Sequence, residues 1–125
     1  LIRSQAIALS DSPLGPWEIQ PKLAVGNLNS EDPAIWYDDK RGRYYGVYHA
    51  FGYMGMITSD DGLNWENAKH YKVLDKAVKK ANGTQIMASR LERPFIYVED
   101  GEPKVMTVAV FEKNKNSYSL FIPLD

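Results

Sequence analysis

Cysteine is absent from this chain, and histidine is nearly so. Without thiols the sequence holds no disulfide framework and no thiolate metal centre. The two histidines, His49 and His70, lack the His-x-x-x-His type of spacing that holds zinc. The acidic pairs in the turns also lack the twelve-residue pattern of a calcium loop. We therefore expect no metal site and no cofactor.

The sequence also has little net charge and no long apolar run. Its formal charge is −1 over 125 residues, which excludes strong non-specific attraction to nucleic acid or to anionic membranes. No apolar run reaches the roughly 20 residues that cross a bilayer as a helix. The sequence contains no secretory signal, and its first residue, Leu1, opens inside a strand-like run. This beginning predicts a processed chain or a fragment of a longer one.

Helical periodicity is scarce, and short β-forming runs between turn residues take its place. We expect Pro21 to Ser30 to be a connection, and Asp75 to Ala81 to form a short helical turn that ends near Gly83. The pattern predicts an all-β fold of antiparallel strands. The predicted strands are Ile2–Leu9, Trp17–Ile19, Pro33–Tyr37, Arg43–Phe51, Tyr53–Thr58, Pro94–Val98, Pro103–Val110 and Tyr118–Ile122.

Two segments place an acid directly before a proline and an apolar run: Glu31-Asp32-Pro33 and Leu91-Glu92-Arg93-Pro94. Asp32 and Glu92 lie 60 positions apart, and such a period suggests a repeated supersecondary unit. Two turns that run from Ser-Asp to Trp-Glu, over residues 10–18 and 59–66, repeat as well. A unit of about 60 residues with about four strands matches a β-propeller blade.

We therefore predict part of a propeller. Residues 1–20 would end one blade, 31–74 would form a full blade, and 90–125 most of a further blade. A closed propeller needs at least about four blades, so this length supplies an incomplete one. Two blades alone expose unpaired strand edges, which favour association with another chain.

Each acid at these strand starts has a structural and a functional interpretation. Glu92 lies between Arg90 and Arg93, so an ion pair is the structural alternative to catalysis. Asp32 has the alternative of capping a turn before proline. His49 either packs inside the sheet or faces a pocket, where it would hydrogen-bond a sugar or bind a metal through water. Glu31 is a hydrogen-bond partner rather than a catalyst.

The order of these motifs resembles the five-bladed β-propeller glycoside hydrolases, family 43 and more closely the neoagarobiose-hydrolase-like relatives. The Ser59–Trp65 turn, the segment from Leu91 to Pro103 and the ending Tyr118–Leu124 are similar to the C-terminal half of that group. The resemblance implies that Glu92 is the general acid and that Asp32 tunes the acid's pKa. Arg93 stands where family 43 has glycine, some relatives use a histidine as acid, and the first-blade base has no counterpart in this chain.

Glycoside hydrolysis requires a proton donor to the leaving oxygen and a carboxylate that activates water or attacks the sugar. A donor at neutral pH needs a raised pKa, which Asp32 would favour and a facing arginine would oppose. Strand alternation places Arg90 on the same side as Glu92. There its guanidinium group could donate two hydrogen bonds to a substrate hydroxyl or carboxylate. We expect Arg90, His49, Glu31 and Trp36 to bind substrate.

The sequence thus predicts a glycoside hydrolase, or a C-terminal fragment of one, that cleaves a plant or algal polysaccharide with inversion. Its expected partner is carbohydrate, with self-association or a complementing propeller chain as a further partner. The resemblance implies a periplasmic or extracellular location. The alternative is an inactive propeller fragment that binds carbohydrate or another protein.

Overall fold

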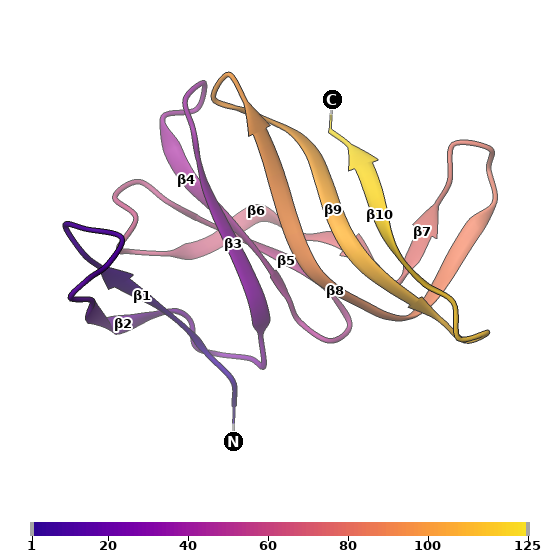
Figure 1. Ribbon diagram of the computed structural model, residues 1–125, viewed down its shortest axis with the longest axis horizontal. Helices are drawn as coiled ribbons and strands as arrows, with labels where there is room; N and C mark the ends of the chain where they lie inside the picture. Colours follow the sequence, from indigo (N-terminus) through magenta and orange to yellow (C-terminus); the bar gives the residue numbers. More distant parts are fainter. Residues whose placement is uncertain (1, 125) are drawn as a thin grey trace.

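The computed structural model describes residues 2–124 and confirms an all-β, antiparallel fold (Figure 1). Ten strands form three sheets, which we call the first (β1–β2), the middle (β3–β4–β5–β6) and the last (β10–β9–β8–β7). No helix among the described residues is long and apolar enough to cross a membrane. The strands are β1 Gln5–Leu9, β2 Glu18–Val25, β3 Glu31–Asp38, β4 Arg43–His49, β5 Tyr53–Ser59, β6 Glu66–Asp75, β7 Ala77–Lys79, β8 Gln85–Glu99, β9 Glu102–Glu112 and β10 Ser117–Pro123.

The predicted helical turn at Asp75–Ala81 is wrong. Ala77–Lys79 forms strand β7, which pairs with Gln85–Met87 of β8. A helix this short gains too few hydrogen bonds to form alone, whereas the hairpin pairs its backbone and buries Val78 and Ile86. β8 is also much longer than the predicted Pro94–Val98, because it includes this hairpin arm.

The predicted connection from Pro21 to Ser30 is wrong in its first half, since β2 continues to Val25. A proline lacks the N–H that a central ladder needs, but β2 has a neighbour on one side only. Pro21 is therefore tolerated there.

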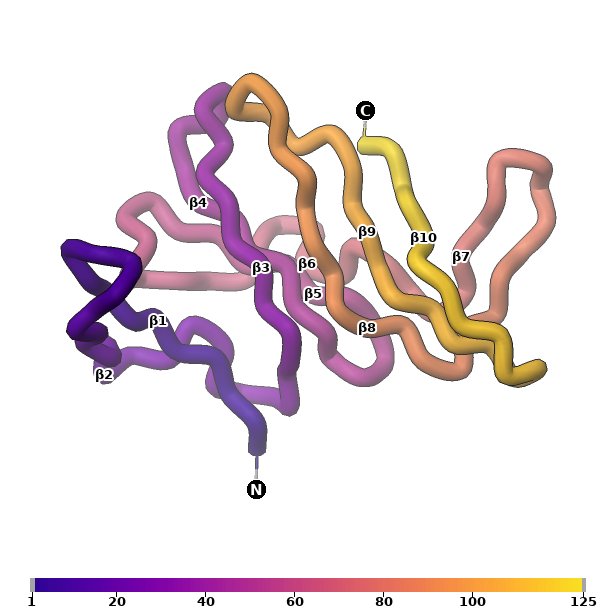
Figure 2. The backbone as a smooth tube through the Cα atoms, viewed as in Figure 1, coloured from indigo at the N-terminus to yellow at the C-terminus, as the bar shows by residue number. Residues whose placement is uncertain are grey.

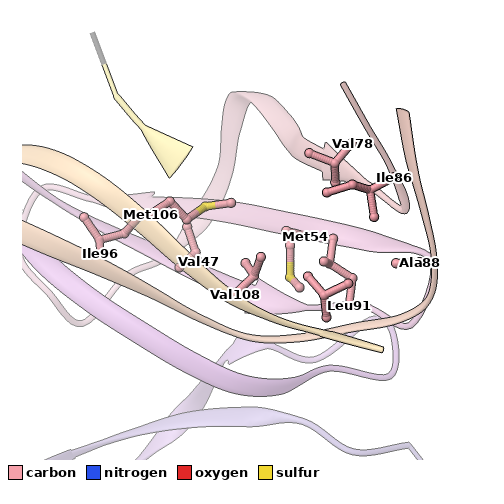
Figure 3. Packing of buried hydrophobic residues seen from close by; sticks show 10 residues of the cluster. Val47, Met54, Val78, Ile86, Ala88, Leu91, Ile96, Met106 and Val108 are labelled. Carbon is pink, nitrogen blue, oxygen red and sulfur yellow. The ribbon is translucent and has the colours of Figure 1, made fainter. Parts of the chain in front are cut away.

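The three sheets stack face to face, with the middle sheet between the other two. Val47 and Tyr48 are adjacent in β4 and so point to opposite faces. Tyr48 packs with Ile57 and with Val25 of the first sheet, whereas Val47 packs in the larger core against the last sheet. Figure 3 shows that core, where Met54 from the middle sheet lies near Leu91 and Val108.

β3 and β8 run side by side in the same direction (Figures 1 and 2). Between Arg90 and Glu99, β8 pairs only with β9, which leaves its other edge facing β3. At the far ends of these strands the hairpin tips are joined, because the Asp39 amide donates a hydrogen bond to the Gly101 carbonyl (3.1 Å). At the opposite ends lie the two acid–proline segments.

Candidate functional site

Both acid–proline segments form β-bulges. The ladder between β3 and β4 shifts between Glu31 and Ala34, and that between β8 and β9 shifts between Glu92 and Phe95. The residue before each proline has a left-handed backbone, with φ of 53° at Asp32 and 52° at Arg93. Bulges of this kind redirect a strand's side chains.

The bulges correct the repeat inferred from the sequence. Glu31 and Glu92 each precede the bulge, and Asp32 and Arg93 each have the positive φ. The structural counterpart of Glu92 is therefore Glu31 and not Asp32. The 60-residue spacing matched Asp32, which has the positive φ in its bulge, with Glu92, which precedes its bulge.

The first bulge places two acids beside a buried histidine. His49 ends β4 directly opposite Glu31 in the ladder, and it is 3% exposed. Its Nδ1 lies 3.9 Å from Glu31 Oε2 and has no hydrogen-bond partner among the described residues. The ring packs on Phe51, with centroids 4.7 Å apart.

Burial lowers the pKa of His49, and the carboxylates of Glu92, Asp32 and Glu31 oppose that shift. Because β8 packs against both β3 and β4, the charge of Glu92 acts on the histidine together with those of the first acid segment. At neutral pH the imidazole is uncharged. The close approach to Glu31 is then a dipole contact and not an ion pair.

Glu31, Asp32 and His49 could hold a cation, since one ligand atom from each lies within 4.8 Å of the others. Two carboxylates and a neutral imidazole are suitable donors for a divalent metal. No metal site was expected from the sequence, because the spacing of the two histidines along the chain does not match a zinc site. The sequence does contain a signal for this cluster. If the predicted hairpin of β3 and β4 is paired residue by residue from its loop, His49 comes to lie opposite the acids.

Glu92 is paired with Arg90, the structural alternative considered for it. Arg90 Nε lies 2.9 Å from Oε1, and a terminal nitrogen of the same guanidinium lies 3.0 Å from Oε2. This two-pronged hydrogen bond lowers the pKa of Glu92, while partial burial works against it. Glu92 is thus ionised at neutral pH. A proton donor needs the opposite shift.

Asp32 is exposed, and Glu31 is half-buried beside Arg3, which contacts its carboxylate. Arg3 also lies over the Phe51 ring, 5.7 Å from its centroid. The segment that leads into β1 therefore covers one side of the cluster. Sequence reasoning missed Arg3 because nothing near it in the chain marks a site.

Trp36, predicted to bind substrate, lies away from this cluster. It stacks on Tyr45 at 5.6 Å and packs in the core between the middle and last sheets. There it lines a cavity of about 330 Å³ together with Asp38 and Arg41. The structure thus groups Glu31, Asp32, His49, Arg90 and Glu92, and leaves Trp36 out.

The chain brings three carboxylates, one uncharged imidazole and one arginine to one end of two adjacent strands. This set is able to bind hydroxyl groups, to coordinate a cation and, with a suitable pKa, to transfer a proton. Comparison of the chain with protein-family models, curated proteins and solved structures finds no match to any of them.

Proposed function

We propose that the chain is the C-terminal part of a five-bladed propeller glycoside hydrolase, in which the cluster around His49 forms part of a sugar-cleaving pocket. One observation carries this proposal. Two parallel, adjacent strands have the same acid–proline bulge, and the acids of the first bulge lie beside a buried histidine that also feels the charge of Glu92 in the second. In the propeller enzymes that the sequence resembles, the innermost strand of each blade delivers acids to a central pocket.

In this function Glu92 protonates the leaving oxygen and Asp32 tunes the proton affinity of the pocket. Glu92 becomes a donor only when Arg90 leaves it, because their hydrogen bonds favour the ionised carboxylate. A substrate hydroxyl or carboxylate that attracts Arg90 would release Glu92 beside the like charges of Asp32 and Glu31. The general base comes from outside these 125 residues. Inverting enzymes hold that carboxylate roughly 6.5–9.5 Å from the acid, which leaves room for a water.

The proposal is tested by measuring how fast the complete encoded protein hydrolyses plant and algal oligosaccharides. The Glu92→Gln variant should lose at least about 100-fold in kcat, the scale of a missing general acid. Glu99→Gln is the matched control, because Glu99 is exposed at the opposite end of the same strand. Activity in Glu92→Gln equal to that of the control would reject the role of Glu92.

A second function, an inactive propeller module that binds carbohydrate, is favoured by the Arg90–Glu92 pair itself. In this state Glu92 holds no proton to donate, and Arg90 and Glu92 are both able to hydrogen-bond sugar hydroxyls. Saturable oligosaccharide binding without release of products, measured by calorimetry and chromatography, would support this function over the first.

A further inference from the structure

Two acids and a histidine meet at the first bulge. In a regular strand the neighbours Glu31 and Asp32 would point to opposite faces, but the bulge between Glu31 and Ala34 brings both acids to His49. One ligand atom from each of the three residues lies within 4.8 Å of the others. Acids alone are common on protein surfaces, so the histidine decides what this group is able to bind.

The Nδ1 atom of His49 is buried and has no partner. The residue is 3% exposed, and Nδ1 makes no hydrogen bond with any of the described residues. Glu31 Oε2 lies 3.9 Å from it, beyond hydrogen-bond distance. Because a buried polar atom without a partner costs free energy, this nitrogen requires a group that the described chain does not supply.

Two cationic side chains border the group, and both are engaged elsewhere. Arg3 contacts Oε1 of Glu31, which leaves Oε2 facing the histidine. The Lys76 ammonium acts on His49 only as a nearby charge, and it donates a hydrogen bond to the Ser89 carbonyl (3.0 Å). Oxygen and nitrogen lone pairs therefore face one another, and a positive ion between them would bind both.

We infer that Glu31, Asp32 and His49 bind a divalent cation that accepts nitrogen and oxygen ligands together, namely Zn²⁺ or Mn²⁺. An imidazole nitrogen suits such metals, whereas Ca²⁺ takes oxygen ligands. Two ligands on one zinc ion lie at most roughly 4.4 Å apart, so closing on the ion requires only small side-chain rotations.

The cation has access from solution. The Glu31 side chain is 33% exposed and Asp32 is exposed, so only the histidine ligand is buried. Three protein ligands leave at least one position for water, as in zinc sites that keep an open position. Arg3 holds the second oxygen of Glu31 and thereby orients the carboxylate, the usual task of a group behind a metal ligand.

This inference goes beyond the proposed function, which requires no cation. A bound cation would neutralise the negative charges of Glu31 and Asp32, which favour a proton on Glu92. Cation binding and proton donation by Glu92 are therefore opposed. Because binding is measured without any sugar, its outcome does not depend on whether the protein cleaves glycosides.

Calorimetric titration of the untagged, complete encoded protein with Zn²⁺ and with Mn²⁺ tests the inference. Zn²⁺ should bind more tightly than Mn²⁺. His49→Gln and Asp32→Asn should each weaken binding by at least about 100-fold, since loss of a group behind a ligand already costs 10–100-fold. The matched controls are His70→Gln, at an exposed histidine of β6, and Asp100→Asn, at an exposed aspartate that also has a positive φ.

Nuclear magnetic resonance identifies the ligand atom directly. Zn²⁺ should shift the ¹⁵N resonance of His49 Nδ1 and leave both ring nitrogens of His70 unchanged. Circular dichroism checks that each variant folds. If His49→Gln does not fold, Asp32→Asn carries the test, because Asp32 is exposed and asparagine tolerates a positive φ.

Three outcomes would overturn the inference. The first is a wild-type protein that binds neither metal more tightly than about 1 mM, which would leave water as the partner of Nδ1. The second is tight binding that survives in Asp32→Asn and in a folded His49→Gln, since the metal would then lie elsewhere. The third is binding that leaves the Nδ1 resonance of His49 unmoved.

Discussion

Among single residues, Glu92 has the environment that most affects the proposed function. Its carboxylate accepts two hydrogen bonds from Arg90, whereas Arg93 acts on it only as a nearby charge. The direction of the shift follows from this geometry, because hydrogen bonds to the ionised form favour that form. Its contribution to stability is present above the unfolded pKa of about 4.3 and is lost as pH falls through the lower folded value.

Removing the Arg90 guanidinium should therefore raise the pKa of Glu92. We expect Arg90→Gln to show this rise in an NMR titration of the Glu92 side-chain carboxyl. The variant should also lose less stability than wild type as the pH falls below about 4.3. Arg93→Gln is the matched control, with a smaller rise. Equal titration curves for wild type and Arg90→Gln would show that the ion pair does not form in solution.

At the scale of a single strand, the bulge in β8 forces Arg93 into a backbone conformation that is unusual for arginine. Arg93 adopts a φ of 52° directly before Pro94, in a region that L-residues other than asparagine and aspartate seldom visit. Glycine has no such penalty at this position. At the equivalent position stands Asp32, and aspartate visits this region more readily than arginine does.

Replacing Arg93 by glycine and by alanine should separate backbone strain from the lost charge. Both variants remove the same guanidinium, but alanine keeps the Cβ that disfavours positive φ. We expect Arg93→Gly to be more stable than Arg93→Ala by about 1 kcal/mol, measured by urea denaturation. Equal stabilities would mean that the bulge relaxes once the arginine is gone.

The strands were predictable from the sequence where alternation and turn residues agreed, as in the strand that begins at Arg43 and in the turn after Ser59. The first of these ends at His49 and not at the predicted Phe51. The hairpin of β7 and β8 was not, because Ala77–Lys79 becomes a strand only through pairing with Gln85–Met87. For the site, the sequence marked Glu92, Asp32 and His49. It could not reveal that Glu92 and Glu31 are equivalent, since that depends on a bulge which alters the register without changing the residue pattern.

At the scale of the whole molecule, the middle and last sheets are held together by their core and by the contact between hairpin tips. Gly101 has a φ of +72°, and a Cβ built on it would lie 2.0 Å from a carboxylate oxygen of Asp39. No side chain fits there without moving that tip. The tip contact keeps β3 and β8 aligned, and with them the distant acid cluster.

A methyl group at Gly101 should loosen that alignment. Gly101→Ala should destabilise the chain by more than the roughly 1–2 kcal/mol that positive φ alone costs, measured by thermal unfolding. Gly83→Ala is the control, because Gly83 has a φ of +84° with open space around its Cβ position. Equal losses in the two variants would show that the Asp39 contact adds nothing.

The two Trp-Glu turns differ in how much of each indole meets water. Trp65 is 7% exposed beside Tyr44 of β4, and its Nε1 donates a hydrogen bond to the Gly62 carbonyl. Trp17 follows the same kind of turn in the two-stranded first sheet, and it is 58% exposed. Trp17 is therefore an intrinsic fluorescence reporter at this end of the chain. Iodide should quench the emission of Trp17 more than that of the half-buried Trp36 or the buried Trp65. A partner that covers Trp17 should move its emission to shorter wavelength.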